Sequence, residues 1–477
     1  MLLLHHKAMI ACIHIVLSIW LARSVPAVAM QVNNLEADIG KLPSTPDWSQ
    51  YCPRIPDLGR RLRLASPCVG IHGSGYAMKA LGIPTDSTHI YDLEAGYAGC
   101  LTEHLLSMGM DPVHISLHLG QSFGDVLKVA LSYLRAPIDF LISGPPCPPW
   151  AGQGIHGSLR DPKAKVFLRI IQWVVFFAKS CGLVGVVLEN VIGIKQCIGG
   201  LEPTINHFLR VLRKFVPEFD WVVDTLKLVD YACAQSRVRV LLRGMRTCIV
   251  KHVPQCMPSF GVRSLKDTLG GFPNTLRSTL SSNHRDNLES METTIRNMVK
   301  AGRLRHEDIV VISLDRASNK EYKQPLSINV APTLTTHNAY LFVLSVGDVV
   351  LGTPDASRTF FRFIQPIERL PLQGFPTTLV KTLPAELIVK ACGNAYPPPV
   401  ILAAVAPMIM AFAFSGVDTA NWPPIELLSQ GMPDEVQKAM VAMRRPLRVA
   451  DKKKHAAWKA KHAPAKKRKN RHRSDSE

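Results

Sequence analysis

The stretch GPPCPPW at residues 144–150 follows the apolar run IDFLIS at residues 138–143, which predicts a short buried strand. Proline fixes φ, so the four prolines hold Cys147 rigidly in a loop at the end of this strand. In open α/β sheets, ligands and chemistry are found at such strand ends. We therefore predict that Cys147 is a reactive thiol, with a structural proline-rich turn as the alternative.

Three further segments carry polar residues next to apolar runs. VVLENV predicts a second strand, which ends in Glu189 followed by an amide. In QSRVRVLL, strand alternation places Gln235, Arg237 and Arg239 on one face. GNAYPPPV, which begins at Gly393, leads into an apolar helix. Each segment by itself is a weak signal, but the four occur in order and with sensible spacing.

In this order, Pro-Cys, Glu-Asn-Val, Gln-x-Arg-x-Arg and Gly-Asn resemble the DNA (cytosine-5) methyltransferase family. The resemblance covers residues 67–414, most of the chain. It implies an α/β fold with a Rossmann-like S-adenosylmethionine methyltransferase sheet, mixed but mostly parallel, with helices on both faces. It also implies a small second lobe that recognises the target.

The pattern along the chain agrees with a sheet covered on both faces, because apolar runs alternate with amphipathic segments from residue 64 onward. The expected strands are 66–71, 88–92, 113–117, 139–143, 185–189, 220–227 and 237–243. The expected helices are 76–81, 98–107, 124–134, 164–181 and 204–215.

After residue 243 the pattern becomes polar and irregular, with two charged helical stretches, and order returns at 331 with a hairpin through 340–351 and a helix over 399–414. The expected division has five parts. They are an N-terminal apolar segment and lead-in (1–60), a catalytic domain (61–244), a small target-recognition lobe (245–330), a return to the catalytic domain (331–428) and a basic disordered tail (429–477).

Composition indicates a globular protein with a polyanionic partner. The 477 residues are 47% hydrophobic and 19% charged, and the net charge is +19. Residues 444–477 carry +11 of it, from 14 Lys/Arg against 3 Asp/Glu. A basic balance suits nucleic acid, although a basic tail is also simply a solvated chain end. The eleven cysteines contain no Cys-x-x-Cys pair, so we expect neither a metal site nor a disulfide framework.

The two ends of the chain predict different locations. Residues 1–21 are apolar and the sequence AVA at 27–29 resembles a signal-peptidase site. The run KKRK at 466–469 instead predicts a nuclear address. A start at Met30 would remove the first segment. We expect a nuclear protein without stable membrane association.

The chemistry expected of the first three segments is attack on a pyrimidine. A thiolate that adds to C6 of cytosine makes C5 nucleophilic, and Cys147 is the candidate. Glu189 could protonate or hydrogen-bond N3. Arg239, with Arg237 beside it, could stabilise charge on O2. Alternatively, Glu189 is a solvated loop acid and the arginines form a structural ion pair or bind phosphate. The resemblance implies the first set of roles, around a base flipped out of the duplex.

The resemblance also implies S-adenosylmethionine as the methyl donor. The glycine-rich turn in PCVGIHGSG includes Gly70 and precedes a helix. The family pattern here is Phe-x-Gly-x-Gly, but this chain has Cys68 for the aromatic residue and His72 for the second glycine. An imidazole there could crowd the donor. With the register shifted by one, Gly73 and Gly75 could serve instead.

Four polar residues complete the expected donor site. Asp92 ends the next strand, where an acid commonly accepts the ribose hydroxyls, and Glu94 is a second candidate. Asp125 resembles the acid that receives the adenine amino group, although an acid at a helix N-terminus is an equal alternative. Asn394 resembles the residue that closes the donor pocket, with a plain Gly-Asn turn as the alternative.

These expectations describe a DNA (cytosine-5-)-methyltransferase that acts on double-stranded DNA. An RNA substrate such as transfer RNA is the first alternative. The continuation Pro148-Pro149-Trp150 differs from the Phe-Thr form that we associate with the RNA class, which favours DNA. A degenerate, non-catalytic nucleic-acid-binding protein of the same fold is the second alternative, because His72 and the unusual N-terminus depart from the family.

Overall fold

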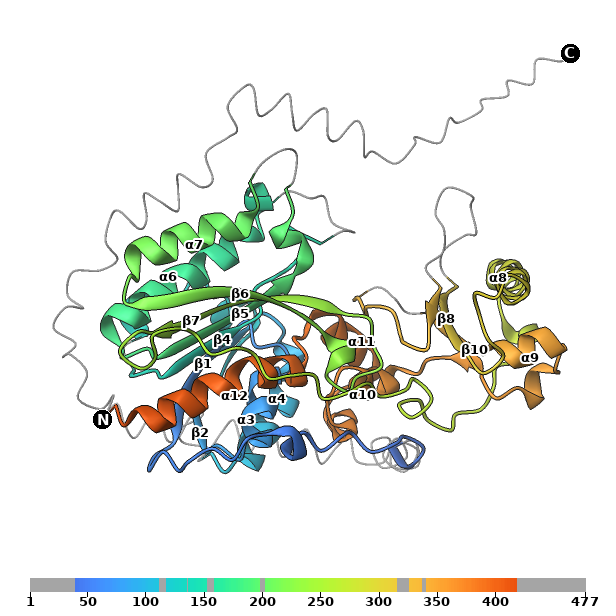
Figure 1. The fold of residues 1–477 in the computed structure, drawn as a ribbon, viewed down its shortest axis with the longest axis horizontal. Coiled ribbons are helices and arrows are strands. Elements are labelled where there is room, and N and C mark those ends of the chain that lie inside the picture. Colours follow the sequence, from blue (N-terminus) through green and yellow to red (C-terminus); the bar gives the residue numbers. More distant parts are fainter. Residues whose placement is uncertain are drawn as a thin grey trace, which may run out of the picture.

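The structure is a computed structural model that describes residues 39–417 except 111–116, 135, 152–157, 198–201, 315–325 and 337–339. The expected signal-like segment and the expected basic tail therefore lie outside the described residues, as does most of the strand expected at 113–117. The described chain forms two sheets of unequal size with helices packed on them (Figure 1).

The large sheet has seven strands in the order β3-β2-β1-β4-β5-β7-β6. All of its strands run parallel except β7, which is antiparallel to both of its neighbours. The expected mixed, mostly parallel sheet is thus confirmed. Its strands are β1 (Leu62–Pro67), β2 (Thr85–Asp92), β3 (Leu117–Leu119), β4 (Phe140–Ser143), β5 (Gly185–Val191), β6 (Phe219–Lys227) and β7 (Val238–Arg246).

Helices cover both faces of this sheet, on opposite sides in Figure 1. Alternate residues of β4 show why, because Leu141 packs in the cluster under α6 whereas Phe140 and Ile142 pack with α12. A strand that is apolar at every position is therefore buried on two sides. The helices are α6 (Ala164–Ser180) and α7 (Thr204–Phe215) on one face, and α3 (Gly73–Ala80) and α12 (Pro398–Ser415) on the other, with α4 (Ala98–Ser107) beside α3.

Helix α12 is the only helix among the described residues that is long and apolar enough to cross a membrane. Its apolar window is 67% buried against the large sheet and α3. A helix that is hydrophobic all round suits the core of a large protein as well as a bilayer. Burial therefore accounts for its composition.

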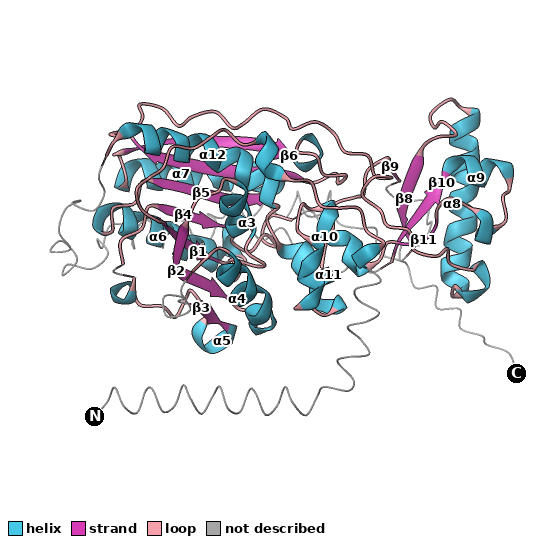
Figure 2. Cartoon of the chain, turned by 90° about the horizontal axis from the view of Figure 1, so that it is seen from below, coloured by secondary structure: helices cyan, strands magenta, loops and turns pink. Residues whose placement is uncertain are grey.

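The small sheet is antiparallel and has the order β11-β10-β8-β9. It lies apart from the large sheet, with α10 (Arg369–Leu372) and α11 (Ala385–Asn394) between the two (Figure 2). Because β10 and β11 follow residue 330, the boundary expected there runs through this sheet. Its elements are α8 (Ser282–Lys300), β8 (Ile309–Ser313), β9 (Ser327–Ile328), β10 (Leu341–Ser345), α9 (Val346–Leu351) and β11 (Phe361–Phe363).

Two local expectations were wrong. No α-helix forms over the expected residues 124–134, all of which the structure describes: the short α5 (Gly120–Phe123) ends before them, and only Leu131–Tyr133 forms a 3-10 turn. The Asp125 side chain accepts from the amide of Leu127 and so competes with helical bonding. The hairpin expected through 340–351 is β10 followed by α9, because Val346 and Val349 pack into the core of the small lobe at helical spacing. Of the two charged helical stretches expected between 245 and 330, the described residues contain one long helix, α8.

The first strand also differs from expectation. It ends at Pro67, several residues earlier than predicted. The chain then adopts left-handed backbone angles at Cys68, Gly70 and His72, with φ of 56°, 56° and 62°. Such angles cannot continue a strand, so the segment turns directly into α3.

Candidate active site

Nine of the eleven site residues expected from the sequence line one cavity of about 520 Å³ at the carboxyl ends of β1, β2, β4 and β5. This is the edge at which open α/β sheets bind ligands. The nine are Cys147, Glu189, Arg237, Arg239, Gly70, Asp92, Glu94, Asp125 and Asn394.

The loop that carries Cys147 is held at both ends. Before it, the Asn190 side chain donates to the Pro145 carbonyl over 3.1 Å. After it, the amide of Trp150 donates to the Cys147 carbonyl over 2.9 Å. The Trp150 ring is buried, and its Nε1 donates to Thr204 Oγ1 over 3.0 Å. Cys147 is thus fixed at the cavity between two anchored neighbours.

The charges around Cys147 have opposing effects on its thiol. Burial raises the pKa of Cys147, and the Glu189 carboxylate raises it further, whereas Arg239 and Arg237 lower it. The resting group is therefore a thiol at neutral pH. The two arginines are the groups that favour the thiolate when the proton leaves.

Glu189 and Arg239 meet because β5 and β7 are antiparallel neighbours. Arg239 is opposite Val191 in the ladder, which places it diagonally across from Glu189 on the same face. Arg239 Nε lies 2.5 Å from Glu189 Oε1, and both side chains are buried. The contact is an ion pair by distance, but Oε1 accepts no aligned hydrogen bond from any described residue.

Glu189 is therefore buried, and its Oε1 can still accept a hydrogen bond. Burial raises the pKa of Glu189, and the nearby Arg239 and Arg237 only partly oppose this effect. A carboxyl group of this kind exchanges a proton more readily near neutral pH than an exposed one. It is suited to donate to, or accept from, a ring nitrogen of a bound base.

Arg237 is also buried at the cavity, but its guanidinium is already in use. It donates to the carbonyls of Leu334 (3.1 Å), Cys392 (3.3 Å), Gly393 (3.4 Å) and Ala395 (2.7 Å). Burial lowers the pKa of Arg237 to about 9, so the group remains charged at neutral pH. The sequence predicted that both arginines surround a base. In the structure Arg239 pairs with Glu189, whereas Arg237 binds backbone carbonyls.

The opposite end of the cavity is acidic. Asp92 accepts from the amides of Gly70 (2.8 Å) and Glu94 (2.9 Å), and burial raises its pKa. Asp125 lines the same end. A cluster of carboxylates complements a ligand that carries hydroxyl groups and a positive charge, as S-adenosylmethionine does. The residues present therefore fit that donor.

Lys390 is a charged lining residue that the sequence reasoning missed. Lys390 forms an ion pair with Glu94 across the rim, which lowers the pKa of Glu94. It lies one turn before Asn394 on α11, so helical spacing could have identified it. Cys68 also lines the acidic end, where the family pattern has an aromatic residue. The left-handed backbone angle of Cys68 arises in the turn after β1, and the sequence did not predict it.

Gly73 and Gly75 are the two expected site residues that face the interior instead. A Cβ on Gly73 would lie 2.3 Å from the Tyr396 carbonyl oxygen, and one on Gly75 would lie 2.4 Å from His72 Nδ1. These glycines allow α3 to pack closely against its neighbours. Their expected role in donor binding is corrected to one in packing.

His72 also points away from the cavity. Its ring is fully buried and packs edge-on against His104 with centroids 5.2 Å apart. The crowding of the donor that its position suggested is therefore not a feature of this fold. Burial lowers the pKa of His72 to about 4, so the ring is neutral.

The family model for C-5 cytosine-specific DNA methylases matches residues 115–409, more than half of the chain. The chain belongs to this family. The resemblance based on four ordered motifs is thereby confirmed. The reaction of this family is methyl transfer to C5 of cytosine, so the protein belongs to a family of transferases.

Solved structures of similar fold include the Entamoeba histolytica methyltransferase EhMeth, with 13% identity, a TM-score of 0.46 and coverage of 73% of this chain and 98% of that one. An Escherichia coli prophage protein assigned as a DNA modification methyltransferase has 16% identity, a TM-score of 0.45 and coverage of 74% and 98%. The S. pombe Dnmt2 methyltransferase has 16% identity, a TM-score of 0.43 and coverage of 73% and 98%. A comparison with curated protein sequences gives no match.

Proposed function

We propose that this protein transfers a methyl group from S-adenosylmethionine to C5 of cytosine in double-stranded DNA through a covalent adduct between Cys147 and C6. One observation carries the proposal. Cys147, Glu189 and Arg239 line the same cavity as the acidic cluster that includes Asp92 and Asp125. A nucleophile with its acid and cation at one end, and a donor-sized acidic recess at the other, is the arrangement that this transfer requires.

The base end supplies the covalent chemistry. Cys147 Sγ forms a bond to C6, which makes C5 nucleophilic. Glu189 protonates or hydrogen-bonds N3, which draws electron density toward the ring nitrogen during attack. Arg239 stabilises the charge that develops on O2. The thiol proton passes to water before attack, and transfer of the methyl group to C5 would release S-adenosylhomocysteine. After C5 has given its proton to water, the S–C6 bond breaks, N3 returns its proton to Glu189 and the Cys147 thiolate is restored.

The donor end positions the methyl group. S-adenosylmethionine supplies an electrophilic methyl on a sulfonium. Gly70 and Asp92 at the ends of β1 and β2, Asp125, and Asn394 on α11 are the residues that would hold it. The carboxylates favour the positive charge of the donor, and Lys390 balances part of their charge at the rim. Both ends lie in one cavity, so the methyl group and C5 could meet without a domain movement.

DNA is the proposed substrate because the protein carries a net charge of +19, which favours a polyanion, and because the Cys147 loop continues as Pro148-Pro149-Trp150. A half-buried thiol in a cavity cannot reach a stacked base. The target cytosine is therefore proposed to leave the duplex before attack.

Covalent trapping tests the proposal. Duplex DNA containing 5-fluorocytosine, incubated with the protein and donor, should give a complex that survives denaturing electrophoresis. Cys147→Ala should abolish it. Cys248→Ala is the matched control, because Cys248 is exposed and follows the end of β7 opposite to the end that carries Arg239, and this variant should trap as the wild type does. Trapping that survives Cys147→Ala would overturn the assignment of the nucleophile.

The choice of substrate has a separate test. Tritium transfer from labelled donor to duplex DNA and to transfer RNA, in parallel reactions, distinguishes the two. Label on RNA alone would overturn the proposed DNA substrate and leave the transferase assignment intact. Calorimetry with S-adenosylmethionine addresses the non-catalytic alternative, which predicts that the donor does not bind.

A further inference from the structure

Arg237 directly precedes β7 and Arg239 lies near the start of that strand, and the contacts of the two arginines point to different ends of the cavity. Arg239 pairs with Glu189 at the base end. Arg237 directs both terminal nitrogens at backbone carbonyls of the segment that follows α11 and of the loop at Leu334. The side chain is 2% exposed, so these bonds form in a dry environment where they are strong.

Two of the four carbonyls that Arg237 binds belong to the last turn of α11. This helix ends at Asn394, and the carbonyls of a final turn have no partner within the helix. Arg237 binds those of Cys392 and Gly393 and, beyond the helix, Ala395. A cation at a helix C-terminus also interacts favourably with the helix dipole. The end of α11 is therefore held by a side chain from the segment just before β7.

The same helix turn forms part of the donor end of the cavity. Lys390 and Asn394 are one turn apart on α11, and both line the cavity. Gln373 supports this turn from a position outside the cavity lining, because its side-chain amide donates to the Cys392 carbonyl. Arg237 and Gln373 thus bind one carbonyl from two directions.

We propose that Arg237 is a positioning residue for the methyl donor, which it serves by holding the last turn of α11 so that Lys390 and Asn394 keep their places in the cavity. This inference rests on the proposed function. Strand alternation predicts both arginines on one face, but the base is served by Arg239 and the donor by Arg237. A planar group with five donors suits a set of divergent carbonyls, which an ammonium group would bind less completely.

Donor affinity and base chemistry are measured separately in the experiment. Calorimetry with S-adenosylhomocysteine, without nucleic acid, reports on the donor end. Trapping on 5-fluorocytosine DNA at saturating donor reports on the base end. We expect Arg237→Lys to weaken S-adenosylhomocysteine binding about tenfold, because charge-assisted bonds to the carbonyls are lost. Because Arg237 also favours the Cys147 thiolate, trapping is compared in Gln373→Met, which keeps both arginines and should trap near the wild-type level at saturating donor.

Two further variants complete the test. Arg239→Lys should show the reverse result, with unchanged S-adenosylhomocysteine affinity and reduced trapping. Gln373→Met should weaken binding in the same direction as Arg237→Lys, and it decides the matter if Arg237→Lys fails to fold. Unchanged affinity in Arg237→Lys together with reduced trapping would overturn the inference. A wild-type protein that binds neither donor nor product would instead overturn the proposed function.

Discussion

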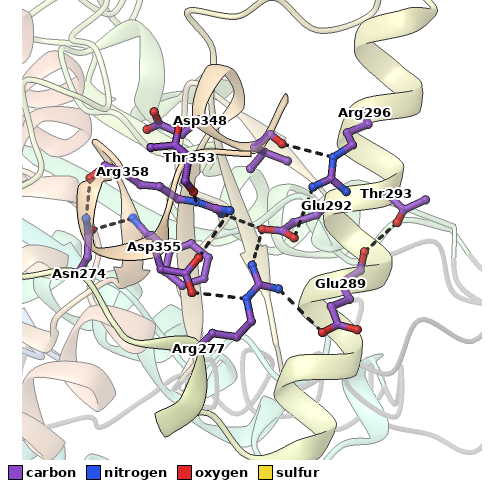
Figure 3. A network of polar contacts seen from close by, with 12 residues as sticks. Asn274, Arg277, Glu289, Glu292, Thr293, Arg296, Asp348, Thr353, Asp355 and Arg358 are labelled. Carbon is purple, nitrogen blue, oxygen red and sulfur yellow. Dashed lines mark hydrogen bonds and ion pairs between the residues drawn. The ribbon is translucent and has the colours of Figure 1, made fainter. Parts of the chain in front are cut away.

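Glu189 in the cavity and Glu292 on α8 in the small lobe are both buried glutamates with arginines beside them, yet they are bound differently. Glu292 Oε1 accepts from Arg277 Nη2 over 2.8 Å and from Arg358 Nη1 over 2.7 Å. Figure 3 shows the two guanidinium groups converging on this carboxylate, with Asp355 between them. Glu189 has one ion pair with Arg239, whose geometry leaves the oxygen without an aligned donor in the described chain.

The pKa shifts follow from this difference. Burial raises the pKa of both groups, but the two hydrogen bonds to Glu292 outweigh burial and lower its pKa overall. For Glu189, burial dominates and its pKa is raised. The Glu292 carboxylate, which accepts hydrogen bonds from two arginines, joins α8 to the segments around it and has no oxygen left to bind a ligand. The Glu189 carboxylate, whose Oε1 accepts no aligned hydrogen bond from the described residues, costs stability but can still hydrogen-bond a substrate, which catalysis needs.

The largest effect that distinguishes the two sites is expected from Glu189→Gln. This variant keeps the shape of the side chain but cannot exchange a proton with N3, so methyl transfer should fall about 10³-fold, a typical magnitude for general acid–base catalysis. Thermal stability should fall less than in Glu292→Gln, because Glu189 makes one buried ion pair, with Arg239, whereas Glu292 accepts hydrogen bonds from two arginines. Tritium transfer and a melting curve measure the two quantities.

The comparison would fail if Glu189→Gln lost as much stability as Glu292→Gln and kept its activity. That outcome would make Glu189 a structural residue like Glu292. Glu189→Asp is a useful companion, since it keeps the carboxyl group but withdraws it from the cavity.

Glu292→Gln should show the opposite pattern. It removes the charge that two guanidinium groups bind in a buried site, and we expect a loss of about 3 kcal/mol in the free energy of unfolding. Urea denaturation measures it, and the matched control is Glu289→Gln on the same helix, where the side chain is 64% exposed and little change is expected. Equal stability of the two variants would show that the Glu292 network contributes nothing.

The buried histidines provide a third case, in which burial acts with no partner. The ring nitrogens of His72 and His89 have no hydrogen-bond partner within the described part of the chain, and burial lowers the pKa of each ring to about 4. Below pH 6.5 these two histidines bind protons in the unfolded chain but not in the folded protein. The free energy of unfolding therefore falls as the pH falls from 6.5 toward 4.

Between pH 7 and pH 6 we expect a loss of about 1 kcal/mol in the free energy of unfolding from these two rings. Denaturation at a series of pH values measures it. His72→Phe should flatten the pH dependence, and a wild-type curve that is already flat over this range would contradict the interpretation.

Much of the large sheet could be predicted from local pattern. The helices at 98–107 and 204–215 have the expected bounds, because apolar residues repeat there at helical spacing. The expectations that failed depended on distant contacts. The run at 346–351 reads equally as strand or helix until the small lobe provides a core for Val346 and Val349.

Most of the residues that line the cavity could also be predicted from the sequence. Motifs at strand ends meet in a parallel sheet whatever the details of packing, which explains why Cys147, Glu189 and Asp92 share a cavity. Gly73 and Gly75 were misassigned because the turn after β1 is shaped by contacts with Tyr396 and His104, which no local pattern reveals.

Sequence alone determined the alternation of strands and helices, the family, and the presence of Arg237 and Arg239 two residues apart where β7 begins, because each depends on short-range periodicity and motif order. Only the tertiary structure decided that the two arginines have different partners. The carbonyl of Cys392 that Arg237 binds is 155 residues away along the chain, and such a contact exists only after α11 has packed beside β7. Side-chain identity follows from the sequence, whereas what a side chain touches depends on the packing of the whole fold.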